Sequence, residues 1–155
     1  MAEYDKTYQQ THDIDWFCKI GNTAMHFASN GGLLPKKVNN REVNSHIQHV
    51  VATMDDVVSE TDQILVNSRY VYERLGANES RESYERYIES FVAMAKKGFV
   101  SFDRMIEKDT YMWIAKPKKA VEVATDELPR FDEDICHRYA LEGDVVHVDC
   151  LNRVE

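Results

Sequence analysis

The residue types best suited to chemistry lie near the start of the chain, at His12, Asp13, Asp15 and His26. Alternate side chains of an extended strand share a face, so Asp13 and Asp15 are expected side by side. His26 falls on the expected partner strand and can approach them across a hairpin. Two carboxylates beside imidazoles can hold a hard cation or divide acid and base roles, so these four are the catalytic candidates. The alternative is that both aspartates form the solvent side of an edge strand.

Metal-ligand patterns elsewhere are weaker. His46 and His49 have the i, i+3 spacing that can chelate one ion from a helix face, but no HExxH motif accompanies them and such pairs are usually plain surface. Residues 147–150 and the neighbours Cys136 and His137 combine ligand types without a recognised spacing. No phosphate loop, dinucleotide fingerprint or GxSxG elbow occurs. The sequence therefore predicts no cofactor and no metal site.

Aromatic residues of the expected hairpins are candidates for a binding surface. Alternation places Phe17, and by the same reasoning Phe27, on the face opposite Trp16, and Trp113 lies on a later strand. Exposed aromatic side chains commonly mark interfaces, so Phe17, Phe27 and Trp113 are binding candidates. Burial in a core is the competing interpretation.

Two β-hairpins are expected to frame the middle of the chain. Residues 14–29 alternate around a tight Gly21-Asn22 turn, and residues 99–105 and 111–115 repeat the pattern around residues 107–109. Further along, 121–123 and 145–148 are expected as short strands and 132–141 as a short helix.

The apolar positions of residues 43–75 recur at helical spacing without Gly or Pro, and a second helix is expected from residue 80 to Gly98. One straight helix over 43–75 would span about 50 Å, far more than the radius of gyration of about 15 Å expected for such a domain. It must break near Ser59–Asp62 or pack on a second copy. The fold class predicted is α+β, with antiparallel β-hairpins packed against a central helical hairpin.

Composition indicates one domain spanning residues 1–155. The chain has 43% hydrophobic and 30% charged residues, and nowhere an apolar run of the length that spans a bilayer, so a cytoplasmic location and no membrane contact are expected. Its three cysteines suggest neither a disulfide framework nor a zinc ribbon. The net charge is −8, and the acidic C-terminal segment 122–155 carries ten acids against three arginines. This balance disfavours nucleic-acid binding.

Three functions remain open on the sequence alone. The first is a non-catalytic cytoplasmic protein-binding domain of the inhibitor, immunity or adaptor type, which uses the acidic C-terminal face or the aromatic face of the hairpins. The second is a small metal-dependent hydrolase with its site at the first hairpin. The third is a structural dimer that self-associates through residues 43–75.

Overall fold

The computed structural model describes residues 3–105, 110–123, 125–131 and 145–147. Within these residues the chain is α+β, with a mixed sheet and helices. The helices are α1 (Lys6–Thr11), α2 (Arg41–Thr53), α3 (Ser68–Leu75) and α4 (Arg81–Lys96), with 3-10 turns at Thr61–Gln63 and Gly76–Asn78. The strands are β1 (Asp15–Ile20), β2 (Thr23–Ala28), β3 (Ile64–Val66), β4 (Val100–Arg104), β5 (Thr110–Pro117), β6 (Arg130–Phe131) and β7 (Val145–His147).

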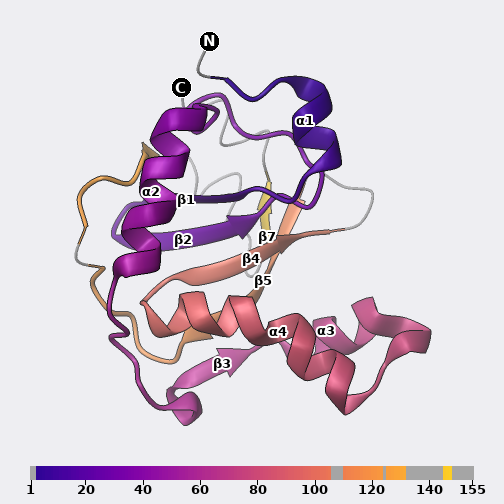
Figure 1. Ribbon diagram of the computed structural model, residues 1–155. Coiled ribbons are helices and arrows are strands. Elements are labelled where there is room, and N and C mark those ends of the chain that lie inside the picture. The colour runs from indigo at the N-terminus through magenta and orange to yellow at the C-terminus, as the bar shows by residue number, and fades with distance from the viewer. Residues whose placement is uncertain (1–2, 106–109, 124, 132–144, 148–155) are drawn as a thin grey trace.

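Both expected hairpins are present, and they belong to one sheet with the described order β3-β5-β4-β2-β1-β6. The antiparallel pairs β1–β2 and β4–β5 are joined by parallel pairing of β2 with β4, in which His26 lies opposite Ser101. β3 and β7 pair with the two ends of β5, on the edge that β4 leaves open. The parallel pair requires the long crossover through α2, α3 and α4 that Figure 1 shows.

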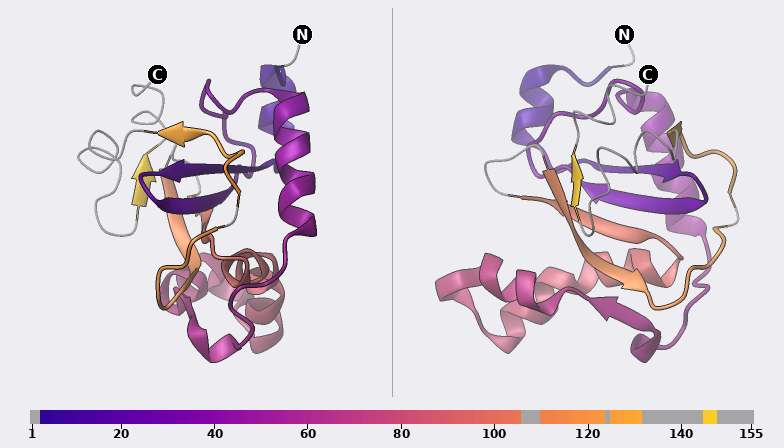
Figure 2. Two further views of the ribbon diagram at one scale, coloured as in Figure 1. Left: turned by 90° about the vertical axis from the view of Figure 1, so that its left-hand side faces the viewer. Right: turned by 180° about the vertical axis from the view of Figure 1, so that it is seen from behind.

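The helices α2, α3 and α4 cover one face of the sheet (Figure 2). Phe17 on this face packs with Ile47 and Val51 of α2, and Ile114 packs with Phe91 of α4. The opposite face carries a second core built on stacked aromatic rings and closed by loop residues and β6. Because both faces are covered, β1 and β2 are buried except at the residue that begins each strand.

Residues 43–75 do not form one helix. The chain breaks as one alternative predicted, but the first helix ends at Thr53, before the predicted position near Ser59–Asp62, and the next α-helix begins at Ser68. α2 ends at Thr53, where the ammonium of Lys97 donates to the carbonyls of Val51 and Met54, both at 2.8 Å. Helix-end carbonyls lack intrahelical partners, so this capping favours the stop. The helical interpretation of Ile64–Val66 was wrong, because these residues pair with β5 as β3. The break removes the geometric argument for a long arm that needs a second copy.

The second predicted helix is confirmed as α4. Ser80 caps it by accepting a hydrogen bond from the Ser83 amide at 3.0 Å, and Phe91 and Ala95 of its apolar face are buried. α3 precedes it and joins it through the Gly76–Asn78 turn.

The secondary-structure predictions for the chain beyond residue 117 are confirmed only in part. Residues 121–123 are not a strand, and β6 at Arg130–Phe131 takes the edge position beside β1 instead. β7 confirms a strand at 145–147. The expected helix 132–141, Cys136, His137, Asp149 and most of the acidic segment lie outside the described residues. No helix among the described residues is long and apolar enough to cross a membrane.

Candidate functional site

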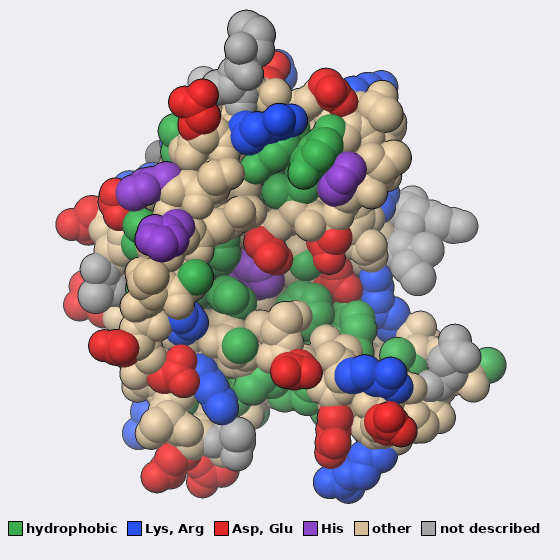
Figure 3. All heavy atoms as spheres, viewed as in Figure 1, with side chains coloured by type: hydrophobic (Ala, Val, Ile, Leu, Met, Phe, Trp, Pro, Cys, Tyr) green, Lys and Arg blue, Asp and Glu red, His purple; other side chains and the backbone are tan. Residues whose placement is uncertain are grey.

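A cavity of about 550 Å³ lies between α1, α2 and α4, and a second of about 340 Å³ lies between the first hairpin, α3 and α4; the two share Asp13 and Asp15. We call them together the interhelical cleft. Its walls come from α1, α2, α3 and α4, and its floor from β1, β2 and β4. The lining residues used below are Tyr4, Tyr8, His12, Asp13, Asp15, Phe17, Arg41, Arg74, Tyr87, Met94 and Asp103. Figure 3 shows acidic side chains and one histidine at the centre of this face, between α2 and α4, while other histidines lie over α1 and α2.

Asp15, which lines the cleft, contacts the buried His26 diagonally across the first hairpin, in which His26 pairs with Phe17. The Nε2 of His26 lies 2.8 Å from Asp15 Oδ1, and its Nδ1 lies 2.6 Å from the hydroxyl of Ser101, its neighbour on β4. A neutral imidazole satisfies both bonds when Nε2–H donates to the carboxylate and Nδ1 accepts from the hydroxyl. The histidine is 2% exposed, whereas the Asp15 side chain is 55% exposed. A buried histidine thus fixes a carboxylate that faces solvent.

These three residues resemble a Ser-His-Asp triad in composition but not in arrangement. Ser101 is fully buried, so its hydroxyl cannot reach a substrate, and the solvent-facing member is the carboxylate. A nucleophilic triad requires an accessible hydroxyl whose proton the histidine removes. The interaction therefore holds Asp15 in place and does not activate Ser101.

Asp13 and His12 complete the set predicted from the sequence. Asp13 Oδ1 accepts from the Asn30 amide at 2.9 Å, which anchors this exposed carboxylate to the turn after β2. The His12 ring stacks on Tyr8, with ring centroids 3.7 Å apart, and its Nδ1 lies 2.9 Å from the Tyr8 carbonyl. The structure thus brings Asp13, Asp15 and His12 to one cavity, with His26 hydrogen-bonded to Asp15.

A buried ionic cluster at the α3 end of the cleft was missed by the sequence reasoning. The Arg74 guanidinium lies 3.2 Å from Asp103 Oδ2, donates to the Arg104 carbonyl at 2.9 Å and lies over the Tyr87 ring. The Tyr87 hydroxyl donates to the same carboxylate oxygen of Asp103. Arg74 and Asp103 are distant in sequence and have no shared motif, so no local signal marks the pair.

Burial dominates the electrostatics of this cluster. It raises the pKa of the Asp103 carboxyl above its ordinary range, although the Tyr87 hydroxyl and the Arg74 charge both lower it; the charge of Asp13 raises it further. Burial and the neighbouring Asp103 also raise the pKa of Tyr87, so its phenol keeps its proton and remains a donor. Desolvation and ion pairing act in opposite directions on such a buried pair.

The two metal-ligand candidates predicted from the sequence, His46 and His49, lie on α2 away from the cleft. His46 is exposed and lies 2.9 Å from Glu127 through Nε2, while His49 is exposed on the same helix. Among the described residues, no group of three or more His, Cys, Asp or Glu side chains is placed to hold a metal ion.

The face assignment of Phe27 was wrong. Phe27 lies opposite Trp16 in the hairpin and stacks on it with centroids 4.1 Å apart, because directly paired residues of an antiparallel pair point the same way. Phe17 is buried but lines the cleft, and Trp113 is half-buried with the Lys116 ammonium over its ring. Phe27 is therefore part of the core, whereas Phe17 contributes to the wall of the larger cavity.

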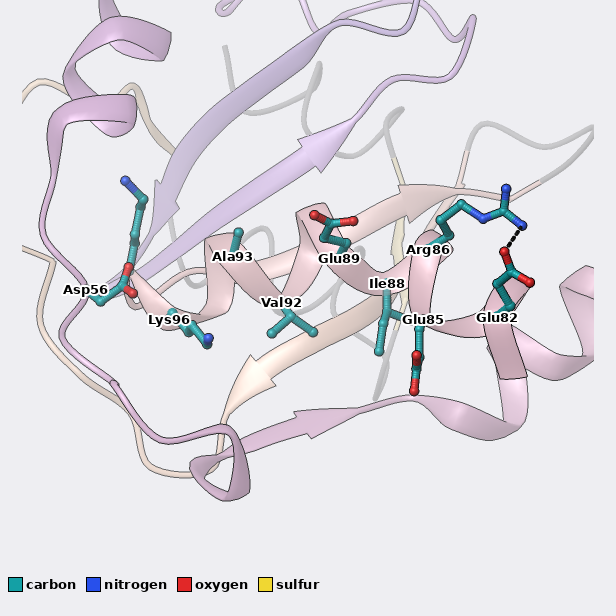
Figure 4. A pocket seen from close by; sticks show the side chains of 10 residues that line it. Asp56, Glu82, Glu85, Arg86, Ile88, Glu89, Val92, Ala93 and Lys96 are labelled. Atoms are coloured by element: carbon teal, nitrogen blue, oxygen red, sulfur yellow. Dashed lines mark ion pairs between the residues drawn. The ribbon is translucent and has the colours of Figure 1, made fainter. Parts of the chain in front are cut away.

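A wider groove of about 630 Å³ follows the outer face of α4 (Figure 4). The acids that α4 itself contributes, Glu82, Glu85 and Glu89, lie in its first two-thirds, where Glu82 pairs with Arg86 at 3.7 Å, and Lys96 and Lys97 lie at its C-terminal end. This distribution complements the helix dipole. Since Lys97 also caps α2, the helix itself accounts for these charges, and the interhelical cleft remains the better site.

No family model matches the chain, and comparison with curated proteins and with solved structures finds no match either.

Proposed function

We propose that the protein is a non-catalytic protein-binding domain of the inhibitor, immunity or adaptor type, acting in the cytoplasm through its interhelical cleft. The observation that supports this most is the fixed, solvent-facing carboxylate pair at the centre of the cleft. Asp15 is positioned by His26 and Asp13 by the Asn30 amide, so neither must be ordered on binding. Preorganised groups in a concave surface bind with less entropic cost than mobile ones.

The surface proposed here differs from the two expected from the sequence, which were the acidic C-terminal face, most of which lies outside the described residues, and the aromatic face of the hairpins. Phe27 is buried, and Phe17 faces into the cleft, so the hairpins present no aromatic face built on these two residues. The cleft instead combines carboxylates with aromatic and apolar walls. Rims of polar groups around apolar surface are typical of protein interfaces.

The experiment is affinity capture with the immobilised chain and lysate of the source cells, followed by elution with salt. The test variant is Asp15→Asn, and the matched control is Asp56→Asn, which removes the same charge from an exposed residue in the α4 groove. We expect a partner that elutes with salt, is retained by the control and is lost, by roughly tenfold or more, from the test variant. Equal capture by both variants would refute binding through the cleft.

A second candidate, a small hydrolase, is favoured by one observation. Asp15 lines the larger cavity with His12 and Asp13 and is hydrogen-bonded at 2.8 Å to the buried His26, which is the convergence an acid–base site requires. The test is a screen of ester, phosphoester and peptide substrates with Mg²⁺, Mn²⁺ or Zn²⁺ added. Turnover by the wild type that Asp15→Asn abolishes and Asp56→Asn preserves would make the enzyme the better conclusion. Absence of turnover would leave the binding function standing.

A further inference from the structure

The α1 end of the cleft already holds a guanidinium group of the chain itself. The Arg41 guanidinium carbon lies 5.2 Å from the ring centroid of Tyr4 and 5.1 Å from that of Tyr8, and all three residues line the larger cavity. Guanidinium groups stack favourably on aromatic faces. This wall is therefore suited to arginine.

The α3 end holds a second guanidinium. Arg74 contacts the Asp103 carboxylate at 3.2 Å and lies 5.6 Å from the centroid of the Tyr87 ring, in the smaller cavity. Each end of the cleft thus pairs an arginine with aromatic rings, and the α3 end adds a carboxylate.

The middle of the cleft has two carboxylates, but among the described residues it has no arginine like those at the two ends. Asp13 and Asp15 line both cavities, yet among the described residues neither lies within ion-pair distance of a lysine or arginine. Asp15 accepts from the imidazole of His26, and among the described residues Asp13 accepts from the Asn30 amide. The carboxylates of Asp13 and Asp103 repel each other, because the charge of Asp13 raises the pKa of Asp103. A positive charge at this point would relieve it.

The walls of the middle section suit the stem of a long basic side chain. Phe17 and Met94 line the cavity beside the two aspartates and are buried and half-buried, respectively. Lysine and arginine lay their methylene groups along apolar surface and place the charged head against polar groups. A guanidinium, unlike an ammonium, matches a carboxylate with two parallel hydrogen bonds.

We propose that the middle of the interhelical cleft binds an arginine side chain of the protein partner, with the guanidinium between Asp13 and Asp15 and its stem against Phe17 and Met94. The proposal rests on the protein-binding function above and specifies the group that the partner contributes. The charge of the cleft complements a basic loop, which carries its arginine into a concave site.

The test uses a peptide probe and does not need the partner. Acetyl-Gly-Arg-Gly-amide is titrated into the isotopically labelled full chain, and the side-chain carboxyl carbons of Asp13 and Asp15 and the His26 ring are followed by NMR. The citrulline peptide, which has the same shape without the charge, is the matched control ligand. Asp13→Asn and Asp15→Asn are the test variants, with Asp56→Asn as the control, and amide spectra confirm that each variant is folded.

We expect saturable shifts at Asp13, Asp15 and His26, an affinity at least tenfold weaker for citrulline, and a similar loss in either test variant, as for a charge-assisted pair. The Asp56→Asn variant should bind as the wild type. Shifts spread evenly over surface acids, or equal binding of citrulline, would refute the arginine site. If the peptide does not bind but capture from lysate depends on Asp15, the arginine site is refuted and the proposed function is retained. If the peptide binds but capture does not depend on Asp15, the proposed function is refuted.

Discussion

Removing one hydroxyl from the buried ionic cluster tests the electrostatic account of the fold. In wild-type protein the Tyr87 hydroxyl donates to Asp103, whose side chain is 6% exposed and also pairs with Arg74. Tyr87→Phe deletes that donor and keeps the ring, including its contact with the Arg74 guanidinium. The variant therefore isolates a single hydrogen bond to a buried charge.

The size of the effect follows from the charge on Asp103. Hydrogen bonds to charged groups contribute about 1.5–3 kcal/mol, so the free energy of unfolding should fall by about 2 kcal/mol while the carboxylate is ionised. For a chain of 155 residues this corresponds to a Tm lower by roughly 4–8 °C.

The effect should depend on pH with a definite sign. Burial raises the folded-state pKa of Asp103, and the Tyr87 hydroxyl lowers it, so Tyr87→Phe raises it further. A raised carboxyl pKa contributes stability that is complete below the unfolded-state pKa and is lost as pH rises through the folded-state pKa. Because Asp103 has the higher folded-state pKa in the variant, the variant loses more stability than the wild type as pH rises. The difference in free energy of unfolding between variant and wild type should therefore be larger near about pH 8 than near about pH 5.

The assay is urea unfolding at these two pH values, with Tyr84→Phe as the control. Tyr84 lies on the same helix, and its hydroxyl is 2.6 Å from that of Ser68, so its loss removes a bond between neutral groups. We expect about 1 kcal/mol for the control, unchanged with pH. A Tyr87→Phe deficit below about 0.5 kcal/mol near pH 8, or the same pH dependence in Tyr84→Phe, would refute the reasoning.

Three further substitutions test the packing that positions the cleft. Phe27→Leu, at a fully buried ring stacked on Trp16, should lower the free energy of unfolding by about 1–3 kcal/mol in urea titrations; a neutral effect would contradict its place in the core. Gly98→Ala should lower the free energy of unfolding by more than about 1 kcal/mol, since Gly98 has φ +103° and a Cβ there would lie 3.0 Å from two valine side chains. Gly76→Ala, with open space around it, should lower the free energy of unfolding by less in the same melts. A larger loss for Gly76→Ala than for Gly98→Ala would be inconsistent with the backbone geometry. Ser80→Ala removes the α4 cap and should cost about 1 kcal/mol, measured by thermal melting; an unchanged Tm would show that the cap is dispensable.

The local sequence pattern was sufficient to predict the hairpins and α4. The strands of a hairpin pair with neighbours in the sequence, and α4 follows a single helical periodicity. It failed at Ile64–Val66, where apolar residues at helical spacing became a strand because β5 offered hydrogen bonds that no local rule reveals. The meeting of Asp15 and His26 was predictable from the hairpin turn alone. The contact of His26 with Ser101 was not predictable, because it depends on the parallel pairing of β2 with β4. The Arg74–Asp103 pair was not predictable either, because it depends on the position of α3 beside β4.

That parallel pairing also sets the order in which the molecule can assemble. Each hairpin closes over a short stretch of chain, but His26 and Ser101 are 75 residues apart, and closing a loop of that length costs about 4 kcal/mol of chain entropy before any contact offsets it. Contacts between distant residues form slowly for this reason. We expect both hairpins to form early and β2 to meet β4 late, carrying α4 into position opposite α2. Asp13 and Asp15 thus belong to the early hairpin while the opposite wall of the cleft forms last, so the complete cleft exists only in the fully folded chain.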